Sequence, residues 1–81
     1  MQHPTKVDCI AILSAASELD DDALLALDSR ALGLTRDGME TAAVFLIERA
    51  CFKQHRDRDG HYAVGTLSLQ GKLRLEQLRN G

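Results

Sequence analysis

The stretch LIERACFKQHRDRDGHYAV, residues 46–64, passes from an apolar segment into a run dominated by charged residues and histidine. Near its centre lies the pair Asp59-Gly60, a strong turn signal because glycine readily adopts a positive φ. The surrounding charges keep an exposed strand edge polar. The stretch therefore predicts a β-hairpin with a solvated tip, whose exposed turn is formed by residues 57–60.

The segments on both sides of that turn contain residues that favour strands. Phe52 lies before the turn, and Tyr62 and other strand-favouring residues follow it. We predict two antiparallel strands, at about residues 51–56 and 61–67. A continuous helix across both segments would contradict this interpretation.

Helical patterns precede the hairpin. Apolar spacing predicts a first helix over residues 7–17, with Thr5 as its N-cap. Three aspartates at residues 20–22 favour the start of a second helix over about residues 21–32, because carboxylates stabilise the exposed N–H groups there. Gly33 fits the position just after its end, where a positive φ is common.

A third helix is expected to begin with a cap at Thr35 or Asp37. Asp37 has Glu40 three residues later, which resembles a capping box. At about 100° per residue, one face gathers the apolar side chains expected in the core: Met39, Ala42, Ala43, Leu46, Ile47 and Ala50. The opposite face carries Thr41, Val44, Glu48 and, toward one edge, Phe45.

The chain ends in a leucine-rich segment that predicts a helix over residues 69–79. Ser68 is its expected N-cap. Gly71 conflicts with this helix, because glycine weakens a helix by about 1 kcal/mol relative to alanine. The apolar contacts are expected from Leu69, Leu73, Leu75 and Leu78.

The whole chain has the length and composition of one globular domain. It has 81 residues, of which 44% are hydrophobic. No run approaches the roughly 18 apolar residues of a membrane span, and the start lacks the pattern of a signal peptide. We therefore expect a cytoplasmic protein without a membrane partner. Cys9 and Cys51 lie in apolar helical patterns and are expected to be reduced and buried.

The charges are unevenly distributed along the chain. Residues 1–48 contain nine acidic and three basic groups, a net charge of −6, whereas residues 49–81 contain three acidic and seven basic groups, a net charge of +4. Such a division is consistent with a basic surface for nucleic acid or with a head-to-tail protein contact. Two ordinary solvated faces would give the same pattern.

Two sharper chemical motifs do not fit the hairpin. HRD at residues 55–57 resembles a kinase catalytic loop, but Tyr62 stands where that loop needs asparagine. A calcium loop with Gly60 as its turn glycine would begin at His55 and end at Thr66, and neither is the required carboxylate.

Zinc binding and catalysis are also poorly supported. Cys51, His55 and His61 are close in sequence, but residues 51 and 55 lie about 13 Å apart on an extended strand. Cys51 with His55 is the one thiol–imidazole candidate, and the sequence shows no orienting carboxylate or pocket for it. We therefore predict no metal, no cofactor and no enzymatic activity.

Three stretches together resemble the winged helix-turn-helix superfamily, in particular small MarR-like regulators. RALGLTRDGM, residues 30–39, is similar to the end of a second helix, a turn and the start of a recognition helix. LIERACFKQHRDRDGHYAV is similar to the passage from that helix into the wing, and LSLQGKLRLEQL, residues 67–78, to the helix that follows a wing. The resemblance covers residues 7–79 as a single winged-helix domain, after a flexible N-terminal arm at residues 1–6. It implies an α+β, mainly α fold with three helices, a two-stranded β-hairpin wing and a C-terminal helix.

The resemblance implies a DNA-binding transcriptional regulator of bacterial, plasmid or phage type. We expect a homodimer, because one such unit makes few base contacts and because Leu75 and Leu78 can offer a second apolar stripe. The third helix would enter the major groove of double-stranded DNA, and the hairpin would reach a neighbouring phosphate strand or the minor groove. The residues expected to contact DNA are Arg36, Thr41, Arg49, Lys53, Arg56, Arg58 and Lys72.

The third helix departs from the family's pattern. Recognition helices usually present basic or amide side chains to DNA, whereas Glu40 and Glu48 would repel phosphate and Val44 offers apolar contact. The alternative is a winged-helix-like protein–protein interaction module, an adaptor or inhibitor that does not bind DNA. Its expected contact residues are Val44, Phe45, Glu48, Leu75 and Leu78.

Overall fold

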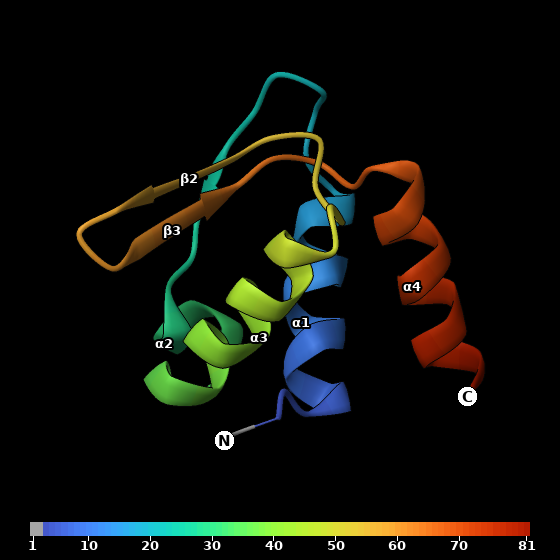
Figure 1. The fold of residues 1–81 in the computed structure, drawn as a ribbon, viewed down its shortest axis with the longest axis horizontal. Coiled ribbons are helices and arrows are strands. Elements are labelled where there is room, and N and C mark those ends of the chain that lie inside the picture. Colours follow the sequence, from blue (N-terminus) through green and yellow to red (C-terminus); the bar gives the residue numbers. More distant parts are fainter. Residues whose placement is uncertain (1–2) are drawn as a thin grey trace.

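The computed structural model describes residues 3–81, which form four helices and one small antiparallel sheet (Figure 1). In chain order the elements are α1 (Lys6–Ser17), β1 (Leu25–Ala26), α2 (Ser29–Leu32), α3 (Arg36–Glu48), β2 (His55–Arg58), β3 (His61–Val64) and α4 (Leu69–Asn80). The fold is therefore mixed and mainly helical, as predicted. The first two residues of the expected N-terminal arm lie outside the described residues.

Local hydrogen bonds set the starts of the three long helices. The hydroxyl of Thr5 accepts a hydrogen bond from the Asp8 N–H, and that of Ser68 accepts one from the Gly71 N–H, so both predicted N-caps are confirmed. Thr35 caps α3 in the same way. The alternative cap, Asp37, lies inside the first turn of α3, so that alternative is wrong.

The predicted helix over residues 21–32 is wrong. The aspartates at 20–22 lie in a turn region, and only Ser29–Leu32 is helical, with Asp28 as its N-cap. Leu25 instead pairs with Val64 in the sheet, so contacts from far along the chain override the local helical pattern. Gly33 does end α2 in the left-handed conformation, at φ 72°, as predicted.

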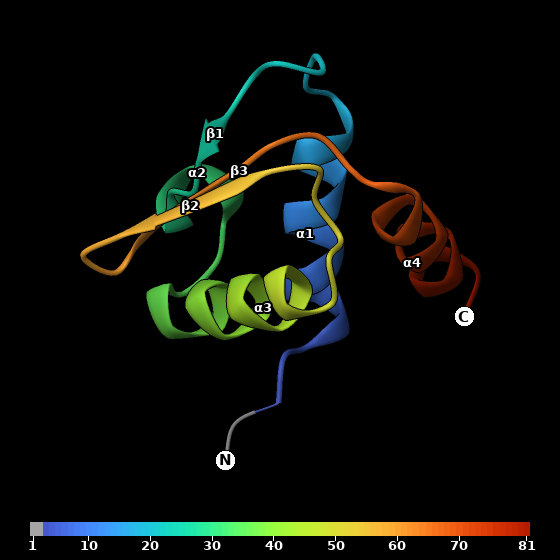
Figure 2. The same ribbon diagram turned by 45° about the horizontal axis from the view of Figure 1, so that its top comes forward.

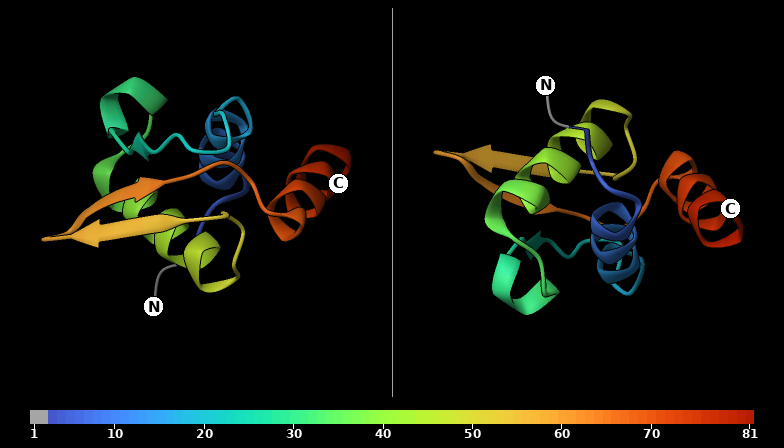
Figure 3. Two further views of the ribbon diagram at one scale, coloured as in Figure 1. Left: turned by 90° about the horizontal axis from the view of Figure 1, so that it is seen from above. Right: turned by 90° about the horizontal axis from the view of Figure 1, so that it is seen from below.

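The sheet has three strands rather than the two expected. Its order is β1-β3-β2, with the short strand β1 pairing antiparallel to β3. The regular strands β2 and β3 are also shorter than predicted. Beyond them the two segments stay joined by an isolated bridge, Phe52 to Leu67, and by hydrogen bonds from the Lys53 N–H to the Thr66 carbonyl and from the Gly65 N–H to the Gln54 carbonyl. The hairpin projects beyond the helices on the side opposite α4 (Figures 1 and 3).

The hairpin turn is tighter than the predicted four residues. Arg58 pairs with His61, so Asp59 and Gly60 alone connect the strands. Both have positive φ, 53° and 79°, which defines a type I′ turn whose twist matches that of the strands. The prediction of turn positions for Asp59-Gly60 is confirmed, whereas Asp57 belongs to β2.

The core lies where α1, packed against both α3 and α4, meets the base of the sheet. In Figure 2, α1 stands between the other two helices. Four of the six core residues predicted on α3 are buried: Met39, Ala42, Ala43 and Leu46. Ile47 packs against this core, but Ala50 is exposed just beyond the helix end with φ 56°, so its predicted place in the core is wrong.

The junction between α3 and α4 is built on close backbone contact. The Cys51 carbonyl accepts a hydrogen bond from the Ser68 N–H, and the Ala50 carbonyl accepts one from the Ser68 hydroxyl at 2.6 Å. A Cβ added at Gly71 would lie only 2.0 Å from the Cys51 carbonyl oxygen. Glycine in α4 is therefore explained by this approach, which outweighs its lower helix propensity.

Both cysteines are free and buried, as predicted. Burial raises the pKa of the Cys9 and Cys51 thiols, Asp8 adds to the rise at Cys9, and the Arg74 guanidinium opposes it at both. Neither thiol is set up as a reactive nucleophile.

The longest helix, α3, has 13 residues, well below the roughly 20 that a membrane crossing needs. Among the described residues, no helix combines sufficient length with sufficient apolar character to cross a membrane.

Candidate functional site

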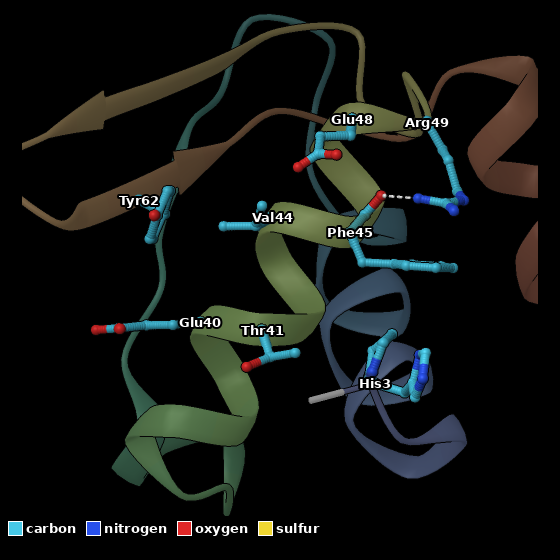
Figure 4. A pocket seen from close by; sticks show the side chains of 9 residues that line it. His3, Glu40, Thr41, Val44, Phe45, Glu48, Arg49 and Tyr62 are labelled. Carbon is cyan, nitrogen blue, oxygen red and sulfur yellow. Dashed lines mark hydrogen bonds between the residues drawn. The ribbon is translucent and has the colours of Figure 1, made fainter. Parts of the chain in front are cut away.

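A hollow with a volume of about 720 Å³ lies along the outer face of α3, between the hairpin and the N-terminal arm (Figure 4). We call it the α3 groove. It is lined by His3, Pro4, Glu40, Thr41, Val44, Phe45, Glu48, Arg49 and Tyr62.

The floor of the α3 groove is the helix face opposite the core. Val44 lies at its centre, with Glu40 one turn before it and Glu48 one turn after it (Figure 4). At a rise of about 1.5 Å per residue, the two carboxylates are roughly 12 Å apart along the helix axis. The groove therefore has an apolar centre between two acidic ends.

The hairpin supplies one wall of the groove through Tyr62. Asp57 pairs directly with Tyr62 across the strands, so both side chains lie on the same face of the sheet. Burial raises the pKa of Tyr62, and the nearby Asp57 and Glu40 carboxylates raise it further. Negative charge thus gathers around the neutral phenol on this side of the groove.

Near the Glu48 end of the groove, an arginine already stacks on an aromatic ring. The Arg49 guanidinium lies 3.6 Å from the centroid of the Phe45 ring and donates a hydrogen bond to the Phe45 carbonyl. A second guanidinium, that of Arg74, lies 5.5 Å from the same centroid. These are cation–π geometries, which hold Arg49 against the helix.

Most of the basic residues expected to contact DNA either have a partner within the chain or lie on a helix away from α3. Arg36 forms an ion pair with Glu40 at 3.1 Å, and Lys53 forms one with Asp21 at 3.2 Å. Lys72 is exposed on α4, which lies across α1 from the hairpin (Figure 2). Thr41 lines the α3 groove. Of the expected DNA-contact residues, Arg36 and Thr41 therefore belong to α3 and Arg49 ends it, whereas Lys72 lies on a separate helix.

Arg56 and Arg58 are the exception, because they alternate with Asp57 along β2. Arg56 pairs with Ala63 and Arg58 pairs with His61, on the sheet face opposite Tyr62. All residues of β2 are exposed. The outer face of the hairpin is therefore basic, while its inner face places the Asp57 carboxylate beside Tyr62.

The residues expected for protein contact also separate into two groups. Val44, Phe45 and Glu48 lie together in the α3 groove. Leu75 is buried in the core and Leu78 packs against it. The exposed leucines of α4 are instead Leu69 and Leu73, which are 72% and 47% exposed.

The sequence did not indicate that Tyr62 lines the α3 groove or that Asp57 lies across the strands from it. The register that joins them follows from a two-residue turn at Asp59-Gly60, so a shorter turn assignment would have predicted it. The contribution of His3 and Pro4 could not be foreseen, because it depends on where the chain passes before α1.

The histidine, cysteine and acidic side chains of residues 3–81 do not gather into a metal-binding group. No group of three or more histidine, cysteine, aspartate or glutamate side chains there could hold a metal ion. Cys51 is fully buried while His55 is exposed on β2, so these two side chains occupy different environments.

Comparisons of the chain with protein-family models, curated proteins and solved structures found no match.

Proposed function

We propose that this chain is a winged-helix-type module that binds another protein through the α3 groove. One observation carries the proposal: the exposed face of α3 presents two carboxylates around an apolar centre. The order of elements supports the winged-helix assignment, because α2 and α3 are joined by a short turn that contains Gly33 and are followed by a β-hairpin.

Charge argues against α3 as a DNA-reading helix. Double-stranded DNA carries one negative charge per ~1.7 Å of its axis, so Glu40 and Glu48 would meet repulsion in the major groove. Arg36, the basic residue at the start of α3, is paired with Glu40. A protein partner without clustered negative charge would not be repelled by these carboxylates.

The composition of the α3 groove is typical of a protein interface. Such interfaces combine an apolar and aromatic centre with a polar rim. Val44, Phe45 and Tyr62 supply the centre, all of them only partly buried, and the acidic groups supply the rim.

The test is affinity capture from the host lysate with nuclease present, comparing the wild type with Val44→Asp. Val7→Asp is the matched control, because Val7 is 71% exposed and lies outside the groove. We expect a nuclease-resistant partner that Val44→Asp loses and Val7→Asp keeps. Equal capture by both variants, or capture only of nuclease-sensitive material, would contradict the proposal.

A second candidate is DNA binding through the outer face of the hairpin, favoured by Arg56 and Arg58 on one exposed surface. Affinity would then come from phosphate contacts. The log of affinity would fall with the log of salt by about 0.9 per phosphate neutralised, and replacing both arginines by alanine would reduce that slope by about two. Glu48→Gln would tighten binding if α3 approaches the same DNA. A random-sequence selection that enriches no motif would count against this candidate.

A further inference from the structure

We propose that the segment which fills the α3 groove is cationic and extended: a large apolar side chain flanked by two arginine or lysine residues, in the pattern basic–x–apolar–x–basic. This inference rests on the proposed protein-binding function and adds the chemistry of the partner.

The carboxylates in and beside the groove would attract two separate cations of the partner segment. Glu48 stands at one end, and in residues 3–81 its carboxylate has no ion pair. Asp57, on the face shared with Tyr62, likewise has no ion pair within the described chain. Glu40, already paired with Arg36, adds charge near Tyr62. A partner cation near Glu48 would therefore meet a carboxylate that no described residue neutralises, and a second cation near Tyr62 would meet the unpaired Asp57 together with the Arg36-paired Glu40.

The spacing fits a short extended segment. Glu40 and Glu48 are separated by roughly 12 Å along α3, and four residues of extended chain span about 13 Å. Side chains at the first, third and fifth positions of such a segment point to the same side. Two cations would then face the acidic ends while the middle side chain contacts Val44.

The groove has a wall on each side of α3. Tyr62 closes one side and His3 lies on the other (Figure 4). An extended segment presents alternate side chains to α3 through a backbone narrower than the about 10–12 Å diameter of a helix. The volume of about 720 Å³ suits a few side chains.

The same chemistry already exists at one end of the groove. Arg49 stacks on Phe45 with its guanidinium 3.6 Å from the ring centroid. Tyr62 offers another ring on the side wall of the groove, flanked by the Asp57 and Glu40 carboxylates, and no cation of residues 3–81 lies over it. A guanidinium placed on Tyr62 would combine a cation–π contact with an ion pair.

The first experiment selects from a displayed random-peptide library on the wild-type protein, after depletion on Val44→Asp. We expect enriched peptides that carry two basic residues around a large apolar one at the stated spacing. Enriched peptides that are acidic, or apolar without cations, would overturn the inference.

The second experiment measures the affinity of the best enriched peptide for Glu48→Lys and for the matched control Glu76→Lys. Glu76 is an exposed acid on α4 outside the groove, so both variants make the same charge change. We expect Glu48→Lys to weaken binding about fivefold to tenfold, because an attraction becomes a repulsion, and Glu76→Lys to change it less than about twofold. Thermal unfolding of both variants checks that each is folded.

The two proposals fail in different ways. Binding that is lost in Val44→Asp but unchanged in Glu48→Lys would overturn the cationic partner and leave the protein-binding groove. Binding that neither variant changes would overturn both. Self-association of the wild type that Glu48→Lys or Arg56→Glu abolishes would replace the separate partner by a second copy of this chain.

Discussion

The junction of α3 with α4 and the hairpin of β2 with β3 are held in shape by different means. At the junction, Cys51 is fully buried and Gly71 lies against its carbonyl so closely that no side chain fits between them. In the hairpin, residues 53–61 are all exposed, and the positive φ angles of Asp59 and Gly60 set the turn. Packing determines the first region, whereas backbone conformation determines the second.

This difference separates stability from recognition. The inner face of α3 builds the core through residues such as Leu46, while its outer face contributes Val44 and Glu48 to the groove. The hairpin adds Asp57 beside Tyr62 without burying Asp57. Side chains that give the groove its charge can therefore be exchanged with little effect on folding, which makes the binding variants interpretable.

The largest effect is expected from Gly71→Ala, which tests whether packing holds the junction of α3 with α4 in shape. A methyl group there would lie 2.0 Å from the Cys51 carbonyl oxygen, so α4 must move or the junction must open. We expect a loss of about 3 kcal/mol or more in the free energy of unfolding, at the upper end of overpacking costs. Chemical denaturation followed by circular dichroism measures it. Gln70→Ala, on the exposed side of the same helical turn, is the control and should not destabilise the protein.

A smaller effect is expected at the hairpin from Gly60→Val. The residue has φ 79° and nothing within 4 Å of an added Cβ, so the cost is conformational strain without a steric clash. A β-branched residue in this conformation should cost about 1–2 kcal/mol, and Gly60→Asn should cost less because asparagine tolerates it. Equal losses for the two variants would argue that side-chain contacts, rather than φ, govern the turn.

The same division explains which features the sequence could predict. The caps at Thr5 and Ser68 and the turn at Asp59-Gly60 depend on neighbouring residues, and all three are found where expected. The segment around Leu25 was misassigned as helix because its partner, Val64, is distant in the chain.

For the groove, α3 periodicity predicted the acidic and apolar outer face but not its walls. Tyr62 joins it through strand register, and His3 through the path of the arm. The role of Gly71 was also hidden, because it depends on a carbonyl that approaches α4 from another segment. Features that require two distant segments to meet were the ones that a single sequence did not reveal.

Alkaline pH should lower the free energy of unfolding through the buried thiols of the packed region. Unfolded cysteine thiols titrate near about pH 8.5, and burial raises the pKa of Cys9 and Cys51 in the folded protein. The unfolded chain therefore loses these protons first as the pH rises. The free energy of unfolding should be highest below about pH 8.5 and fall as the pH approaches the folded pKa values.

Urea unfolding across this pH range, for the wild type and a Cys9→Ala/Cys51→Ala double variant, measures the decline. The double variant should lose less stability with rising pH, even if it is less stable at neutral pH. A remaining decline is expected from Tyr62, whose pKa is also raised, chiefly by burial. An unchanged pH dependence in the double variant would show that the thiols do not contribute.

The smallest effect is expected for the Arg56→Ala/Arg58→Ala double variant. Both side chains are exposed on β2, and neither forms an ion pair within the described residues, so the strand pairing should persist without them. We expect the free energy of unfolding to change by less than about 0.5 kcal/mol.

Val64→Ala, in the same hairpin but fully buried, should cost about 2 kcal/mol through lost apolar burial. If the arginine variant were as destabilised as Val64→Ala, the hairpin would depend on its charged side chains. The loss of DNA binding in that variant could then no longer be assigned to phosphate contacts alone.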